Sequence, residues 1–144
     1  MARKRRGFSI NSSKYSKVSL KSLARILAKS GRYKKFFELK NKALNSENGE
    51  YVLGYHKTGC HACYMIYGIL KTNEKRRLVK PGKGHAEIVL AVKGDLKVTG
   101  YFSGKLKEGS AFYIEEANEC FLENKSNAEA IYIIAGGHTE ESHH

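Results

Sequence analysis

Eight short runs of apolar, β-branched and aromatic residues follow one another between residues 51 and 135. Gly, Asn or Ser separates most of them, and these residues favour turns. Lys93-Gly94-Asp95, between two runs, is typical of a hairpin turn because glycine adopts the positive φ that such turns need. Eight short strands at this spacing predict a closed or double-sheet all-β domain. The runs are 51–56, 62–70, 76–80, 86–92, 96–102, 110–114, 119–124 and 130–135.

Two segments of this region carry glycines at fixed offsets. The first is Gly82-Lys-Gly-His-Ala-Glu-Ile-Val-Leu-Ala-Val-Lys-Gly94, and the second is Gly109-Ser-Ala-Phe-Tyr-Ile-Glu-Glu-Ala-Asn-Glu-Cys-Phe-Leu-Glu-Asn124. Together they resemble the two half-motifs of the cupin family, G-x5-H-x-H-x3-E-x6-G and G-x5-P-x-G-x2-H-x3-N. The resemblance covers roughly residues 62 to 135 and implies a small jelly-roll β-barrel.

The metal ligands of the family are only partly present. With Gly94 as the closing glycine, the acidic ligand corresponds to Glu87, but the two histidine positions hold Pro81 and Lys83. In the second motif the histidine position holds Cys120. Of the four ligands that the resemblance implies, one is retained and one is replaced by a thiol.

A first candidate metal site combines His85, Glu87 and Cys120. His85 and Glu87 are two residues apart, so they share a face if both lie in one strand. The resemblance places Glu87 and Cys120 on the inner face of the barrel. An imidazole, a carboxylate and a thiolate suit one divalent ion, zinc or iron, with a position open for substrate. The structural alternative is that His85 lies in the glycine-rich turn and Cys120 only fills volume.

A second candidate site is His56-Lys-Thr-Gly-Cys60-His61-Ala-Cys63. Two thiols at C-x-x-C spacing, with His56 nearby, form half of a zinc site if the segment turns, but a second C-x-x-C is absent. In a strand, Cys60 and Cys63 would point to opposite faces. A thioredoxin-like redox role lacks its usual strand-to-helix setting. Buried structural cysteines are the third alternative, because free cysteine is often buried.

Charge divides the chain sharply. Residues 1–48 contain 14 Lys or Arg against two acidic residues, a net charge of +12, whereas residues 49–144 contain 12 of each sign. Concentrated positive charge favours a phosphate partner, either nucleic acid or an acidic membrane surface. The alternative is a solvated terminus that only aids solubility.

The basic extension has two predicted parts. Residues 1–17 are too polar to bury a core and are expected to form a flexible arm. Residues 18–48 are expected to form a helix capped by Ser19 and ended by Ser30-Gly31, then a second helix, with their apolar faces on the barrel. A helix-turn-helix is a weaker alternative. The candidate phosphate contacts are Arg3, Lys4, Arg5, Arg6, Arg25, Arg32, Lys34 and Lys35.

The sequence shows neither a signal peptide nor a membrane span, because no apolar run has the required length. Three cysteines, an odd number, do not make a disulfide framework, and a cytoplasmic location is expected. The expected fold is mainly β, a cupin-like jelly-roll β-barrel over residues 49–137 with a basic, partly helical N-terminal extension. Residues 138–144 form a polar tail, and His143 and His144 resemble the remnant of a purification tag.

Two function classes remain open at this point. The first is a cupin-fold binding module whose basic extension docks on nucleic acid or a ribonucleoprotein. The second is a metal-dependent enzyme, resembling the dioxygenases or isomerases of the family, that uses His85, Glu87 and Cys120. No nucleophile and base pair is evident, so catalytic residues are not assigned. The resemblance also implies a homodimer.

Overall fold

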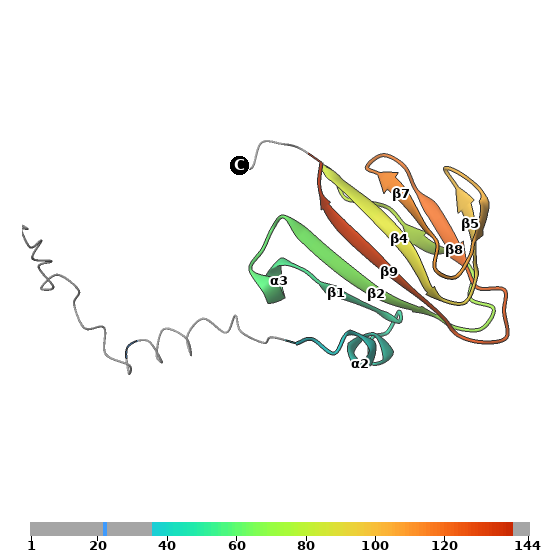
Figure 1. Cartoon of the computed structure of the whole chain (residues 1–144), viewed down its shortest axis with the longest axis horizontal. Coiled ribbons are helices and arrows are strands. Elements are labelled where there is room, and N and C mark those ends of the chain that lie inside the picture. Colours follow the sequence, from blue (N-terminus) through green and yellow to red (C-terminus); the bar gives the residue numbers. More distant parts are fainter. Residues whose placement is uncertain (1–21, 23–35, 140–144) are drawn as a thin grey trace, which may run out of the picture. The chain divides into compact units, whose positions relative to one another are not determined.

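The structure is a computed structural model that describes Ser22 and residues 36–139. Between residues 36 and 139 two short helices and nine strands follow one another in sequence (Figure 1). The helices are α2 (Leu39–Leu44) and α3 (Tyr55–Thr58). The strands are β1 (Glu50–Leu53), β2 (Cys63–Leu70), β3 (Arg77–Val79), β4 (His85–Lys93), β5 (Leu96–Gly100), β6 (Gly104–Leu106), β7 (Ala111–Glu115), β8 (Cys120–Glu123) and β9 (Ala130–His138).

The strands form two antiparallel sheets. One sheet has the order β1-β2-β9-β4-β7, and the other has the order β3-β8-β5-β6. The mainly β fold is therefore confirmed for this part of the chain, but the two sheets do not join into one closed hydrogen-bonded barrel. The edge strands β3 and β6 of the second sheet are only three residues long.

One core lies between the two sheets, because both contribute side chains to the same buried cluster. In β4 the residues alternate: Glu87, Val89 and Ala91 are buried, whereas Ile88 is half exposed. This period of two is what a strand with one buried face requires. Tyr132 of β9 is the largest fully buried side chain of this part of the chain.

Two cross-strand tyrosine–glycine pairs pack between β2 and β9. Tyr64 lies opposite Gly136, and Tyr132 lies opposite Gly68. A Cβ added to Gly136 would lie 2.2 Å from Cζ of Tyr64, and one added to Gly68 would lie 2.0 Å from Cζ of Tyr132. Each aromatic ring therefore occupies the space that the missing side chain leaves, so only glycine fits these two positions without a shift.

Each of the eight predicted runs overlaps a strand, and the turn at Gly94 has the expected positive φ of 77°. The strand β6 and the helical turn α3 were not predicted. The first run ends early because Leu53 is followed by Gly54, after which the chain turns into α3. The last strand reaches His138, one residue into the segment predicted as a polar tail.

The second predicted helix is represented by α2, which contacts β1 and β2 and buries Ala43. Phe36, which the sequence assigned to its apolar residues, is 82% exposed. The arm of residues 1–17, the first helix and all eight candidate phosphate contacts lie outside the described residues. Among the helices that the structure describes, none has the length and apolar character to span a membrane.

Candidate functional site

A cluster of polar side chains lies at one end of the five-stranded sheet. His85 begins β4 and pairs across the sheet with His138 of β9, with the two ring centroids 4.4 Å apart. The ring of Tyr64, from β2, lies 5.8 Å from that of His85. The three residues meet because β2, β9 and β4 are neighbours and each contributes a residue from its inward-facing set.

Glu87 is the buried acidic group of this cluster. It is 5% exposed, and its Oε1 accepts a hydrogen bond from the hydroxyl of Tyr64. Burial raises the pKa of the Glu87 carboxyl, and the hydrogen bond from Tyr64 and the nearby His85 partly oppose that rise. Burial, followed by the hydrogen bond to Glu87, also raises the pKa of Tyr64. Burial at this end of the core therefore favours the protonated forms of both Tyr64 and Glu87.

Cys120 belongs to a different environment. It lies in β8 of the other sheet, opposite Val79 and Gly100, and is fully buried within the apolar core cluster. Over residues 36–139 no three His, Cys, Asp or Glu side chains are grouped so that they could hold a metal ion. The structure thus brings His85 and Glu87 to one face, but it does not complete the predicted set with Cys120. These donors do not fit a three-ligand metal centre.

Sequence reasoning missed His138 and Tyr64 as members of this cluster. Both could have been found from the period of two: His138 continues the alternation of Ala130, Tyr132 and Ile134, and Tyr64 precedes Ile66 by two residues. The last predicted run ends at residue 135, because the two glycines that follow interrupt its hydrophobic pattern.

The second predicted site lies between α3 and β2. His56 is in α3, Cys60 is in the following loop and Cys63 begins β2, and all three are exposed. The two thiols are hydrogen-bonded to each other. The segment is thus a turn at Cys60, and the two sulfurs do not point to opposite faces. His56 does not join them in a group of three metal donors within the described residues.

The two thiols differ in their environment. Hydrogen bonds from the backbone N–H groups of Ala62 and Cys63, with a smaller contribution from the thiol of Cys63, lower the pKa of Cys60. The hydrogen bond to Cys60, and then its charge, raise the pKa of Cys63. Cys60 is therefore the thiol that more readily becomes a thiolate.

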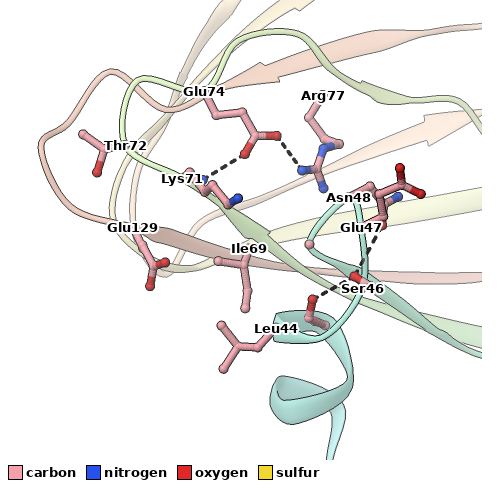
Figure 2. A pocket seen from close by; sticks show the side chains of 12 residues that line it. Leu44, Ser46, Glu47, Asn48, Ile69, Lys71, Thr72, Glu74, Arg77 and Glu129 are labelled. Atoms are coloured by element: carbon pink, nitrogen blue, oxygen red, sulfur yellow. Dashed lines mark hydrogen bonds and ion pairs between the residues drawn. The ribbon is translucent and has the colours of Figure 1, made fainter.

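A cavity of about 490 Å³ opens at another part of the molecule, where the turn after α2 faces the turn after β2 (Figure 2). Arg77 forms an ion pair with Glu74 (Figure 2). It forms a second one, at 3.4 Å, with Glu50. Its Nη1 also donates to the hydroxyl of Tyr132 at 2.9 Å. Two carboxylates thus satisfy this guanidinium. The lining residues are Ala43, Leu44, Ser46, Glu47, Asn48, Gly49, Ile69, Lys71, Thr72, Glu74, Arg77 and Glu129.

No protein-family model matches the sequence, and no curated protein matches it either. The fold is similar to several solved structures. A cupin protein from Bacteroides fragilis has a TM-score of 0.56 and 11% identity, over 69% of this chain and 84% of that protein. The Cupin_2 domain of an XRE family transcriptional regulator from Enterobacter cloacae has a TM-score of 0.52 and 13% identity, over 63% of this chain and 98% of that domain.

An oxalate oxidase is also similar, with a TM-score of 0.58 and 19% identity over 72% of this chain. The present chain spans only 59% of the length of that enzyme. These likenesses agree with the two glycine-bounded segments around Glu87 and Cys120 and with the two facing antiparallel sheets. The chain therefore has the cupin fold.

Proposed function

We propose that this protein is a cupin-fold binding module whose basic N-terminal extension docks on nucleic acid or a ribonucleoprotein. The observation that carries the proposal is the charge division: residues 1–48 hold a net charge of +12, and the remaining residues are neutral. A segment so rich in Lys and Arg neutralises phosphates and releases their counterions, which drives binding at low salt.

The fold alone does not select between binding and catalysis, because it occurs in a transcriptional regulator and in an oxidase. The site residues favour binding. His85 and Glu87 lie in one sheet and Cys120 in the other, and residues 36–139 hold no group of three metal donors. A metal-dependent cupin enzyme that uses these three residues would need a donor set that is not assembled here.

The proposal is tested by binding of the full chain to RNA and DNA of mixed sequence at two salt concentrations. Each phosphate contact contributes a slope of roughly −0.7 to −0.9 in log K against log salt. Removal of residues 1–17, which hold Arg3, Lys4, Arg5 and Arg6, is expected to weaken binding and to flatten this slope. Sequence preference is expected to be poor, because the extension offers no evident base-reading element.

A matched pair of variants shows whether binding depends on where the positive charges lie in the chain or only on the total charge. Replacing Arg3, Lys4, Arg5 and Arg6 by Gln removes four positive charges from the arm. The control replaces four exposed lysines of the cupin part by Gln, namely Lys57, Lys75, Lys83 and Lys125. The first variant is expected to lose more affinity than the second. If the parent protein and both variants bind nucleic acid equally weakly, and salt does not change this binding, the proposal is contradicted. The extension would then serve solubility or protein docking.

Elemental analysis of protein purified natively and without a histidine tag tests the enzyme alternative. We expect a metal content well below one ion per chain. A stoichiometric zinc or iron ion that is lost in a Glu87→Gln variant would overturn the assignment as a metal-free binding module.

A further inference from the structure

The loop from Gly54 to Cys63 is held in one defined conformation. The helical turn α3 ends at Gly59, which has a positive φ of 70° and donates its N–H to the carbonyl oxygen of Tyr55 at 2.7 Å. The hydroxyl of Thr58 donates to the carbonyl oxygen of Gly54 at 3.2 Å and accepts the N–H of Cys60 at 3.1 Å. These bonds set the position of Cys60 relative to the start of β2.

The other end of the loop is tied to the sheet. Cys63 pairs with Gly137 of β9, so its backbone belongs to the ladder. Between the two cysteines, the ring of His61 stacks on that of Tyr55 at 3.6 Å between centroids. The stack turns His61 toward α3. The loop therefore presents the two thiols together while its imidazole is engaged elsewhere.

The two thiols lie three residues apart on this loop, and both are open to solvent. Hydrogen bonds from the backbone N–H groups of Ala62 and Cys63, and then from the Cys63 thiol, lower the pKa of Cys60, whereas the hydrogen bond to Cys60 raises the pKa of Cys63. Both side chains are exposed, in contrast to the buried Cys120. Two neighbouring thiols that solvent reaches are open to thiol–disulfide exchange, whereas a buried thiol in an apolar core is inert.

We propose that Cys60 and Cys63 form a redox-active dithiol that is converted to an intramolecular disulfide by a low-molecular-weight disulfide. The thiolate of Cys60 attacks one sulfur of the oxidant, forms a mixed disulfide and releases one thiolate, which takes a proton from water. Cys63 then loses its proton and attacks the sulfur of Cys60, which forms the Cys60–Cys63 bond and releases the second thiolate. Two cysteine thiols are oxidised, and one external disulfide is reduced to two thiols.

The geometry favours this chemistry over a metal site at the same loop. A closed tetrahedral zinc site needs four ligands, and the described residues supply two sulfurs without a third His, Cys, Asp or Glu grouped with them. An exchange reaction needs only the two sulfurs, and the second step is intramolecular because both thiols lie in one loop, three residues apart. The dithiol is independent of the basic extension, so its test does not depend on the proposed docking function.

The experiment incubates the full chain, after treatment with EDTA, in buffers of reduced and oxidised glutathione without oxygen. Free thiols are trapped by acid and alkylation, and peptides are identified by mass spectrometry. We expect a Cys60–Cys63 disulfide that forms and disappears reversibly with the glutathione ratio. The Cys63→Ser variant is expected to accumulate glutathione on Cys60, whereas Cys60→Ser should carry several-fold less glutathione on Cys63. Cys120→Ser is the matched control and should leave the Cys60–Cys63 disulfide unchanged.

Two results of the glutathione experiment would overturn the proposal. One is a dithiol that stays reduced across the whole range of glutathione ratios. The other is equal glutathione incorporation in Cys60→Ser and Cys63→Ser, which would mean that neither thiol is the preferred attacking group. A parallel sample is loaded with zinc instead of being treated with EDTA. If one zinc ion per chain binds and blocks alkylation of both cysteines, the loop is a metal site and not a redox-active dithiol. Circular dichroism checks that the fold is intact in each variant, including the buried substitution Cys120→Ser.

Discussion

At the residue scale, the space for Tyr64 depends on the absence of a side chain at Gly136. Replacing Gly136 by Ala would place a Cβ 2.2 Å from Cζ of Tyr64, and this atom belongs to a ring held by a hydrogen bond to Glu87. We expect Gly136→Ala to lower the free energy of unfolding by about 1–3 kcal/mol, the usual cost of overpacking. Urea denaturation measures the change.

The matched control is Gly104→Ala in β6, where an added Cβ has no atom within 4 Å. This variant is expected to change the free energy of unfolding by less than about 0.5 kcal/mol, as substitutions without packing effects usually do. If both alanine variants lose the same stability, the tyrosine–glycine contact does not explain the loss.

The buried carboxyl of Glu87 makes the free energy of unfolding depend on pH, which is a second effect at the residue scale. Burial raises the folded-state pKa of Glu87 above its unfolded value, so the ionised form opposes folding at neutral pH. This cost is relieved as pH falls through the folded pKa, because the folded protein then binds the proton first. The free energy of unfolding of the parent protein relative to Glu87→Gln is therefore expected to rise as pH falls through the raised folded pKa toward the unfolded pKa of about 4.3.

Thermal or urea unfolding of EDTA-treated protein at several pH values tests this expectation. Asp95→Asn is the control with the opposite sign, since the hydrogen bond from Lys105 lowers the pKa of Asp95. Its stabilising contribution is present above the unfolded pKa of about 3.9 and is lost only as pH falls further through the lowered folded pKa. A difference between the parent and Glu87→Gln that stays flat from pH 8 down to the unfolded pKa of about 4.3 would contradict the buried-carboxyl assignment.

At the scale of elements, Asn124 joins the turn after β2 to the loop between β8 and β9. Its side-chain amide donates to the carbonyl oxygens of Leu70 at 3.2 Å, Lys71 at 3.1 Å and Ala128 at 2.8 Å. Its Oδ1 accepts the N–H of Ser126 at 3.0 Å. Asn124 is fully buried, so the motif position that the cupin resemblance singled out has a structural role: it satisfies backbone groups of two connections.

Replacing Asn124 by Ala is expected to cost about 1–3 kcal/mol of unfolding free energy, because buried carbonyl groups lose their donor. Asn124→Asp is expected to be destabilising as well, since a carboxylate cannot donate to these carbonyl oxygens. The exposed Asn127→Ala variant in the same loop is the control. Chemical denaturation compares the three variants, and an effect of Asn127→Ala as large as that of Asn124→Ala would refute the assigned network.

At the scale of the whole molecule, charge and core lie in different parts of the chain. The core cluster is drawn from residues between Leu70 and Ile134, whereas the net charge of +12 lies in residues 1–48. The protein without residues 1–17, which tests nucleic-acid binding, is therefore expected to unfold at the same urea concentration as the full chain. A lower urea midpoint for the shortened protein would mean that the arm contributes to stability. Weaker nucleic-acid binding of the shortened protein would then have a second cause besides the lost charge.

The fold class and the charge division could be predicted from the sequence because both depend on local patterns. A period of two in hydrophobicity and glycine at a turn such as Gly94 act within a few residues, and all eight predicted runs overlap a strand. Net charge is a property of composition. The spacing around Glu87 and Cys120 was sufficient to indicate the cupin fold, although it did not indicate two sheets without closure.

The contents of the candidate sites were decided only by the tertiary structure. His85 meets His138, and Glu87 meets Tyr64, through strand order and register, which link residues far apart in the chain. The period of two places His138 and Tyr64 on the inward faces of their strands, but it does not identify their partners, because a strand can pair with any neighbour that completes its hydrogen bonds and buries its apolar face. The contact between Cys60 and Cys63 likewise depended on where the turn ends and β2 begins, which the C-x-x-C spacing by itself left open.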